Sequence, residues 1–95
     1  MFIVLLKFSE NRHRAGELMA GHNSWIQHGF DDGVFLLVGA YQPKLGGTII
    51  ATNISLPELQ SRVNNAPFVA EKVVTAEILE ISPAKAVEQL AFLLD

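Results

Sequence analysis

The sequence contains no cysteine, which excludes disulfide bonds and thiol chemistry and is compatible with a reducing cytoplasm. Charged residues make up only 18%, the net charge is -3 and no basic run occurs, so neither a nucleic acid nor a membrane surface is an expected partner. The apolar start lacks the leader and cleavage site of a signal peptide and is too short to span a bilayer. Phosphate loops, nucleophile elbows and metal motifs are also missing. We therefore expect a cytoplasmic protein with no cofactor and no metal.

Hydrophobic residues are abundant, at 49% of 95 residues, which is enough for one domain with a compact core. Ser9 is the expected N-cap of a first helix, with Glu10 in its first turn, and Ser55 is the expected cap of a second. Hydrophobic periodicity and breakers predict strands at 2–8, 34–41, 48–54 and 73–81, helices at about 10–28 and 56–64, a helical turn within 68–72, and a C-terminal helix over 84–94 within the region 83–95.

This order, β-α-β-β-α-β plus one helix, predicts an α+β fold of the ferredoxin-like type, with a four-stranded antiparallel sheet and both main helices on one face. The strands at 2–8 and 34–41 are apolar on both faces, whereas two helices cover only one. In the second of these strands, the alternation places Val34 and Val38 opposite Phe35 and Leu37. A homodimer that packs sheet on sheet would bury the second apolar face, and the C-terminal helix is the alternative cover.

His22 is the residue with the strongest indication of chemistry. At about 100° per residue it falls on the midline of the apolar stripe of the first helix, with Leu18 and Ile26 four residues away and Met19 and Trp25 three residues away. A titratable ring on a buried face is costly without a partner or a role. One interpretation is a core histidine with a satisfied hydrogen bond. The other is a general base or acid in a cleft between this helix and the sheet.

A catalytic His22 needs an orienting group, usually a carboxylate. The two interpretations predict different structures: a cavity that reaches the ring and a partner within hydrogen-bond reach, or a ring sealed by side chains. His13 and His28 project from other sides of the helix, so a zinc site is not expected and both are interpreted as solvated. The sequence does not choose among the candidate carboxylates, which are Asp31, Asp32, Glu71, Glu77 and Glu80.

Tyr41 and Lys44 flank the hairpin loop and are candidate ligand-binding residues. Tyr41 would supply a hydrogen bond and Lys44 a positive charge to an anionic ligand, and the alternative is an ordinary turn with a solvated lysine. The pair Gly46 and Gly47 either lets a ligand approach the backbone or serves the geometry of the loop.

Short motifs follow one another in a characteristic order: Met1–Val4, the helix with His22, Gly29–Leu36, Gly39, Pro43–Ile50 and Ala66–Val69. This ordered set, over about residues 1 to 83, resembles the YciI-like (YCII-related) family. The resemblance implies a single YCII-related domain over residues 1–95, a dimeric α+β barrel, and an active site built on a histidine and an aspartate, with the family histidine at His22. Dehydrochlorination of a chlorinated hydroxyhydroquinone is among the few activities attached to the family, and that substrate does not carry over to this chain.

Two positions depart from the family pattern. The family commonly reads Asp-Pro-Phe where this chain has Ala66, Pro67 and Phe68, and many relatives carry a basic residue where this chain has Ala40. If the aspartate orients the histidine in the family, this chain has lost that dyad and is either inactive or uses another acid.

Three functional hypotheses follow. In the first, a small cytoplasmic homodimer uses His22 for lyase or isomerase chemistry without a cofactor on a small aromatic or carbonyl-bearing molecule, with Tyr41 and Lys44 orienting it and Phe68 lining the wall. In the second, the chain is a non-catalytic ligand-binding or assembly module. A third, a monooxygenase or muconolactone-isomerase type enzyme, rests on fold analogy alone.

Overall fold

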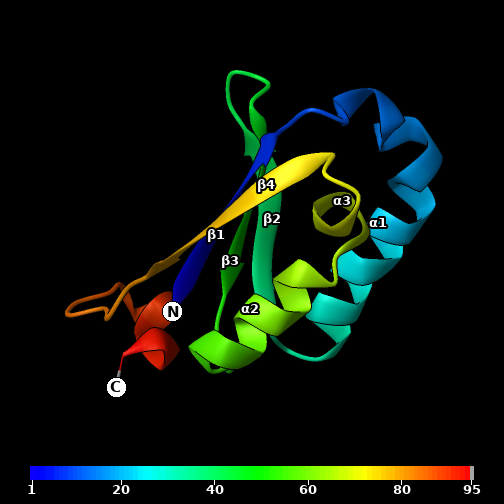
Figure 1. The fold of residues 1–95 in the computed structure, drawn as a ribbon. Helices are drawn as coiled ribbons and strands as arrows, with labels where there is room; N and C mark the ends of the chain where they lie inside the picture. Colours follow the sequence, from blue (N-terminus) through cyan, green and yellow to red (C-terminus); the bar gives the residue numbers. More distant parts are fainter. Residues whose placement is uncertain (95) are drawn as a thin grey trace.

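One twisted sheet forms one side of the molecule, and the helices pack against one of its faces (Figure 1). The computed structural model describes residues 1–94. The strand order is β2-β3-β1-β4 with every neighbouring pair antiparallel, so the predicted ferredoxin-like α+β fold is confirmed. The elements are β1 (Phe2–Phe8), η1 (Arg12–Arg14), α1 (Ala15–Asp31), β2 (Phe35–Tyr41), β3 (Gly46–Ala51), α2 (Leu56–Asn64), α3 (Pro67–Ala70), β4 (Val74–Glu80) and η2 (Glu88–Leu93).

The core lies between the helices and the face of the sheet that they cover. In β1 the alternation buries Val4, which pairs with Ile49 on one side and Ile78 on the other. The helix α2 contributes Leu59 and begins as predicted, because the Ser55 hydroxyl accepts the backbone N–H of Glu58. This local capping signal explains why the start of α2 agrees with the prediction, and its end at Asn64 agrees as well.

The first helix begins later than predicted. The backbone N–H of Ser9 donates to the carbonyl of Val73 at 2.9 Å, and that of Asn11 donates to the carbonyl of Lys72 at 3.0 Å. The chain therefore stays paired with the segment before β4, and a 3₁₀ turn precedes α1. The prediction that Ser9 caps this helix is wrong.

A β-bulge in β2 changes which side chains face the helices. Phe35 pairs with Ala51, but the next register pair is Leu37 with Ile50, so one extra residue interrupts the alternation. Phe35 is buried and Val38, which pairs with Ile49, lies on the covered face, while Leu37 lies on the open face and is 52% exposed. The predicted alternation across 34–38 is therefore wrong.

The C-terminal segment lies beside the start of β1 in Figure 1, where the backbones of Met1 and Ile81 exchange two hydrogen bonds of 2.9 Å. The predicted C-terminal helix over 84–94 forms only in part, as the 3₁₀ helix η2. Val87 is 63% and Phe92 61% exposed, so their side chains bury little apolar area against the rest of residues 1–94, and an isolated short helix is marginal in water. Asp95, the last residue of the predicted range, lies outside the described residues.

None of the helices described in residues 1–94 is long and apolar enough to cross a membrane.

Candidate functional site

A pocket of about 240 Å³ lies where α1 and α3 meet the covered face of the sheet. Met19 and His22 stand one turn apart on α1, Phe68 comes from α3, and Leu6 and Val38 come from β1 and β2. Most of the lining is aliphatic or aromatic. Among the lining residues, all of which belong to the described part of the chain, His22 is the one titratable side chain.

The ring of His22 lies flat against Phe68. The two ring centroids are 3.9 Å apart and the planes differ by 4°, so the stack fixes the plane of the imidazole. Nδ1 of His22 is enclosed and has no hydrogen-bond partner among the described residues. Burial lowers the pKa of His22 below its ordinary value of 6.5, so the ring is neutral at neutral pH.

The two candidate carboxylates at the C-terminal end of α1 are engaged with other groups. Asp31 accepts a hydrogen bond of 2.9 Å from the Gln27 side chain, one turn earlier on the helix. Asp32 forms an ion pair of 2.8 Å with Arg62 of α2. Neither reaches Nδ1 of His22, and both hold the end of α1 in place.

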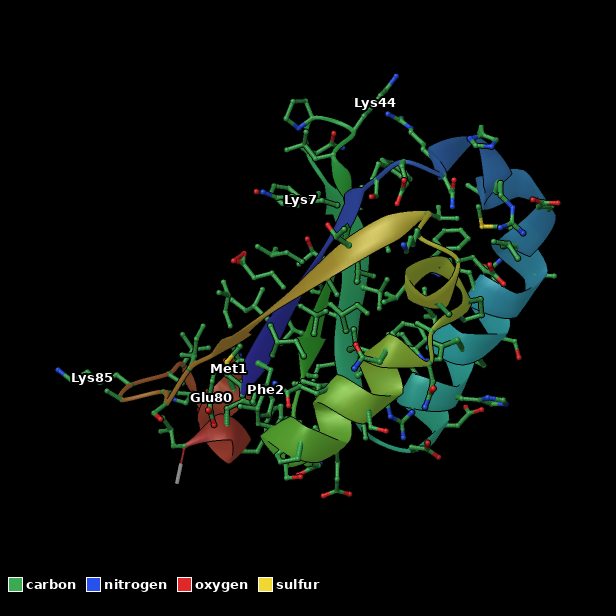
Figure 2. All side chains as sticks on the ribbon, in the orientation of Figure 1. Met1, Phe2, Lys7, Lys44, Glu80 and Lys85 are labelled. Atoms are coloured by element: carbon green, nitrogen blue, oxygen red, sulfur yellow. The ribbon has the colours of Figure 1, made fainter. Side chains whose placement is uncertain are left out.

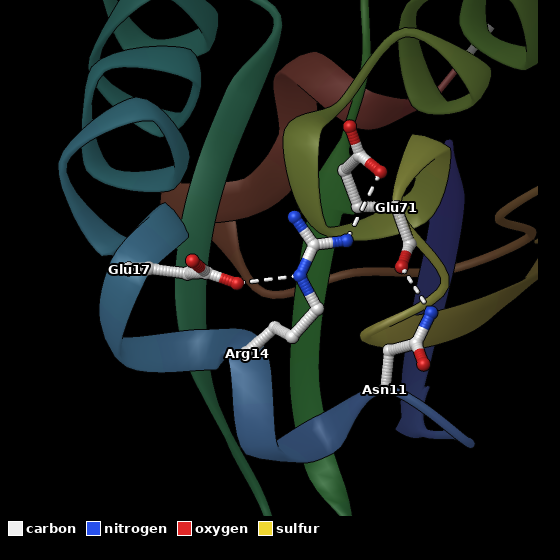
Figure 3. A network of polar contacts seen from close by, with 4 residues as sticks. All are labelled: Asn11, Arg14, Glu17 and Glu71. Atoms are coloured by element: carbon white, nitrogen blue, oxygen red, sulfur yellow. Dashed lines mark hydrogen bonds and ion pairs between the residues drawn. The ribbon is translucent and has the colours of Figure 1, made fainter.

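Glu71 belongs to a polar network that ties the start of α1 to the end of α3 (Figure 3). Its carboxylate accepts from Arg14 at 3.3 Å, and its backbone carbonyl accepts from the Asn11 side chain at 2.9 Å. Glu77 and Glu80 are exposed on β4. The structure therefore pairs none of the five candidate carboxylates with Nδ1 of His22.

Ala66 stands at the position where the family pattern has an aspartate. It is the N-cap of α3, is 1% exposed, and makes no side-chain capping bond. The same short helix carries Phe68, which stacks on His22. The methyl group of Ala66 offers no acceptor to the histidine or to the helix end.

Tyr41 and Lys44 do not line the pocket that holds His22 and Phe68. Lys44 is exposed at the tip of the hairpin loop, where its side chain extends beyond the end of the sheet (Figure 2). The Tyr41 ring lies under Lys7 Nζ, 5.8 Å from its centroid, and Figure 2 shows Lys7 on the side of the sheet opposite the helices. The structure thus brings together two of the four predicted site residues.

Three glycines line the pocket where β2 meets β3: Gly39, Gly46 and Gly47. Gly46 has φ 149°, and a Cβ built on it would lie 1.7 Å from the carbonyl oxygen of Leu6. Loop geometry and close strand approach therefore require this glycine. Sequence reasoning did not place Gly39 in the site, and the signal that could have done so is the run of small residues on neighbouring strands.

His13 and His28 are exposed, as interpreted from the helix geometry. Within residues 1–94 no group of three histidine, aspartate or glutamate side chains could hold a metal ion.

Comparison by sequence finds no family model and no curated protein that matches this chain. By structure, the chain is similar to the 5-chloro-2-hydroxyhydroquinone dehydrochlorinase from Burkholderia phenoliruptrix in its complex with 2,5-dihydroxybenzoquinone. The TM-score is 0.68 at 14% sequence identity, and the match covers 86% of this chain and 94% of that chain. At this identity the similarity shows the fold alone.

Proposed function

We propose that this chain is a YciI-like protein of one domain whose pocket binds and transforms a small molecule, with His22 as the catalytic residue. The reaction class is lyase or isomerase chemistry that proceeds by proton transfer. Phe68 holds the imidazole in place. Tyr41 and Lys44, the other two predicted substrate-binding residues, do not line this pocket, and Lys44 lies on a separate surface with Lys7 and Arg12.

The observation that carries this proposal is the position of His22 in the pocket lining. One titratable ring stands in an otherwise uncharged, mainly apolar pocket, and burial keeps the ring neutral at neutral pH. Perturbed titratable groups in apolar pockets are the usual starting point for assigning an active site.

The pocket favours a ligand of one ring. Its volume of about 240 Å³ is below the roughly 300–1,000 Å³ typical of drug-sized ligands. The lining has no charged side chain to neutralise an ionised ligand. The ring ligand named with the structural neighbour, a quinone, supports the same size class. We therefore propose an uncharged ring compound that carries a carbonyl group.

Exchange of the methyl protons of acetophenone in D₂O, followed by proton NMR, tests the proposal. A base, either His22 or a solvent base, removes a methyl proton to form the enolate, and the carbon then takes deuterium from solvent. We expect the protein to accelerate this exchange about a hundredfold over buffer, and His22→Phe to abolish the acceleration.

His28→Phe is the matched control, because it removes an exposed histidine from the same helix and should leave the rate unchanged. If acetophenone neither binds to the protein nor exchanges its methyl protons faster than in buffer, the proposed enzyme is contradicted.

A non-catalytic binding module is the second candidate. It is favoured by the lack of a hydrogen-bond partner at Nδ1 and by Ala66 in place of the family aspartate. If acetophenone binds in the pocket but its methyl protons exchange no faster than in buffer, the result supports this candidate over the enzyme.

We also propose that the chain acts in the cytoplasm as a homodimer that packs sheet on sheet. The helices cover one face of the sheet, whereas Leu37 and Leu79 are 52% and 41% exposed on the other. The C-terminal segment also exposes apolar side chains, at Val87 and Phe92, which would be buried by the same kind of contact between protomers. Sedimentation that shows a stable monomer at micromolar concentration would contradict the dimer.

A further inference from the structure

The two ring nitrogens of His22 have different surroundings. Nδ1 is enclosed without a partner, while the residue as a whole lines the pocket. Nε2 is therefore the nitrogen that water or a ligand can reach. The stack on Phe68 fixes the ring plane, and within that plane the ring is oriented with Nδ1 on its enclosed side.

A neutral imidazole has one N–H donor and one lone-pair acceptor. If the proton were on Nδ1, a buried N–H would have no acceptor, and orphaned buried N–H groups are rare in native proteins. With the proton on Nε2, the donor faces the pocket and only a lone pair is left unpaired. The surroundings therefore favour the Nε2–H tautomer.

We infer that His22 presents Nε2–H to the pocket as an oriented hydrogen-bond donor, so that the site receives a carbonyl oxygen and His22 is not the base of the reaction. This inference rests on the proposed function and deepens it. In a histidine oriented by a carboxylate, Nδ1–H donates to the acid and Nε2 keeps the lone pair that takes a proton. Here no candidate carboxylate reaches Nδ1, so the opposite arrangement results.

The neutral ring is consistent with this role. Burial without a nearby carboxylate lowers the pKa of His22, so the ring donates as an imidazole and not as an imidazolium. A neutral donor stabilises the developing charge on a carbonyl oxygen as the adjacent carbon loses its proton to a solvent base.

The first test is the tautomer of the free protein, read from two-bond proton–nitrogen correlations in a ¹⁵N-labelled sample at about pH 7.5, above the ordinary histidine pKa. The signals of His22 are assigned by their loss in His22→Gln. We expect a protonated Nε2 and an unprotonated Nδ1. An Nδ1–H ring would overturn the inference.

The second test compares two amides at position 22. The amide nitrogen of Gln can occupy roughly the place of Nε2 and donates a hydrogen bond but takes up no proton, whereas that of Asn is too short to reach it. We expect His22→Gln to retain most of the acetophenone exchange and His22→Asn to bind acetophenone about tenfold more weakly than wild type. Equal loss of acetophenone binding and exchange in both variants, each shown to be folded by circular dichroism, would overturn the donor role.

Failure of the inference and failure of the proposed function are separable. An Nε2–H ring in a protein that neither binds nor exchanges acetophenone would contradict the proposed function and support the tautomer. An Nδ1–H ring in a protein that catalyses exchange would support the enzyme and overturn the donor role.

Discussion

Acid destabilises this protein partly through His22, because the folded state resists protonation of that ring. Burial lowers the pKa of His22 in the folded protein below the value of 6.5 that holds in the unfolded chain. As the pH falls through 6.5, the unfolded chain binds a proton at this position and the folded protein does not. The stabilisation is therefore fully present above that pH and declines as the pH falls toward the lower pKa of the folded state.

The size of the effect has a ceiling. One proton bound by the unfolded state alone changes the free energy of unfolding by about 1.4 kcal/mol per pH unit. Between about pH 7.5 and pH 5.5 the loss is therefore at most about 1.4 kcal/mol, because the uptake begins only near the unfolded pKa. Partial solvent access to the ring reduces the loss further, so we expect a loss below this ceiling.

Urea unfolding at the two pH values measures this loss. Trp25, the one tryptophan of the chain, is a suitable fluorescence probe, since it is half-buried and its indole N–H donates to the Arg62 carbonyl at 3.1 Å. His22→Phe lacks the titrating ring while keeping the exposed His13 and His28, so the difference between the two proteins isolates His22. Equal pH dependence in both proteins would refute the reasoning.

The other predictions concern packing, assembly and the missing acid. Gly29→Ala should lower the free energy of unfolding in urea by about 1–3 kcal/mol, because the added Cβ would lie 2.1 Å from a ring carbon of Phe35 in β2. Gly16→Ala on the same helix is the control, and it should be neutral or stabilising because nothing lies within 4 Å of the added Cβ. Leu37→Glu should shift the protein to monomer in sedimentation without loss of helical circular dichroism; an unchanged dimer would exclude this face as the interface. Ala66→Asp should raise the pKa of His22 in an NMR titration, because a nearby carboxylate favours the imidazolium; an unchanged pKa would place residue 66 outside any dyad.

The elements that follow from local signals could be predicted from the sequence. The cap at Ser55 and the apolar spacing of α2 involve residues within one turn, and the bounds of that helix agree with the prediction. The order of strands and helices gave the ferredoxin-like topology, since each element carries its own periodicity.

The features that sequence reasoning missed depend on distant parts of the chain. Ser9 bonds to Val73, across most of the sequence, and so does not begin a helix. The bulge after Phe35 shows in the register with β3 and not in the alternation of β2 alone. The pocket position of His22 followed from helical spacing, but its unpartnered Nδ1 depends on where every carboxylate ends up after folding.

A crystal structure of the protein with acetophenone tests the central claim most directly. The account predicts the ring in the pocket beside Met19 and Phe68, with its carbonyl oxygen within hydrogen-bond distance of His22 Nε2. An empty pocket, or a ligand seated instead on the surface formed by Lys7, Lys44 and their neighbours, would contradict it.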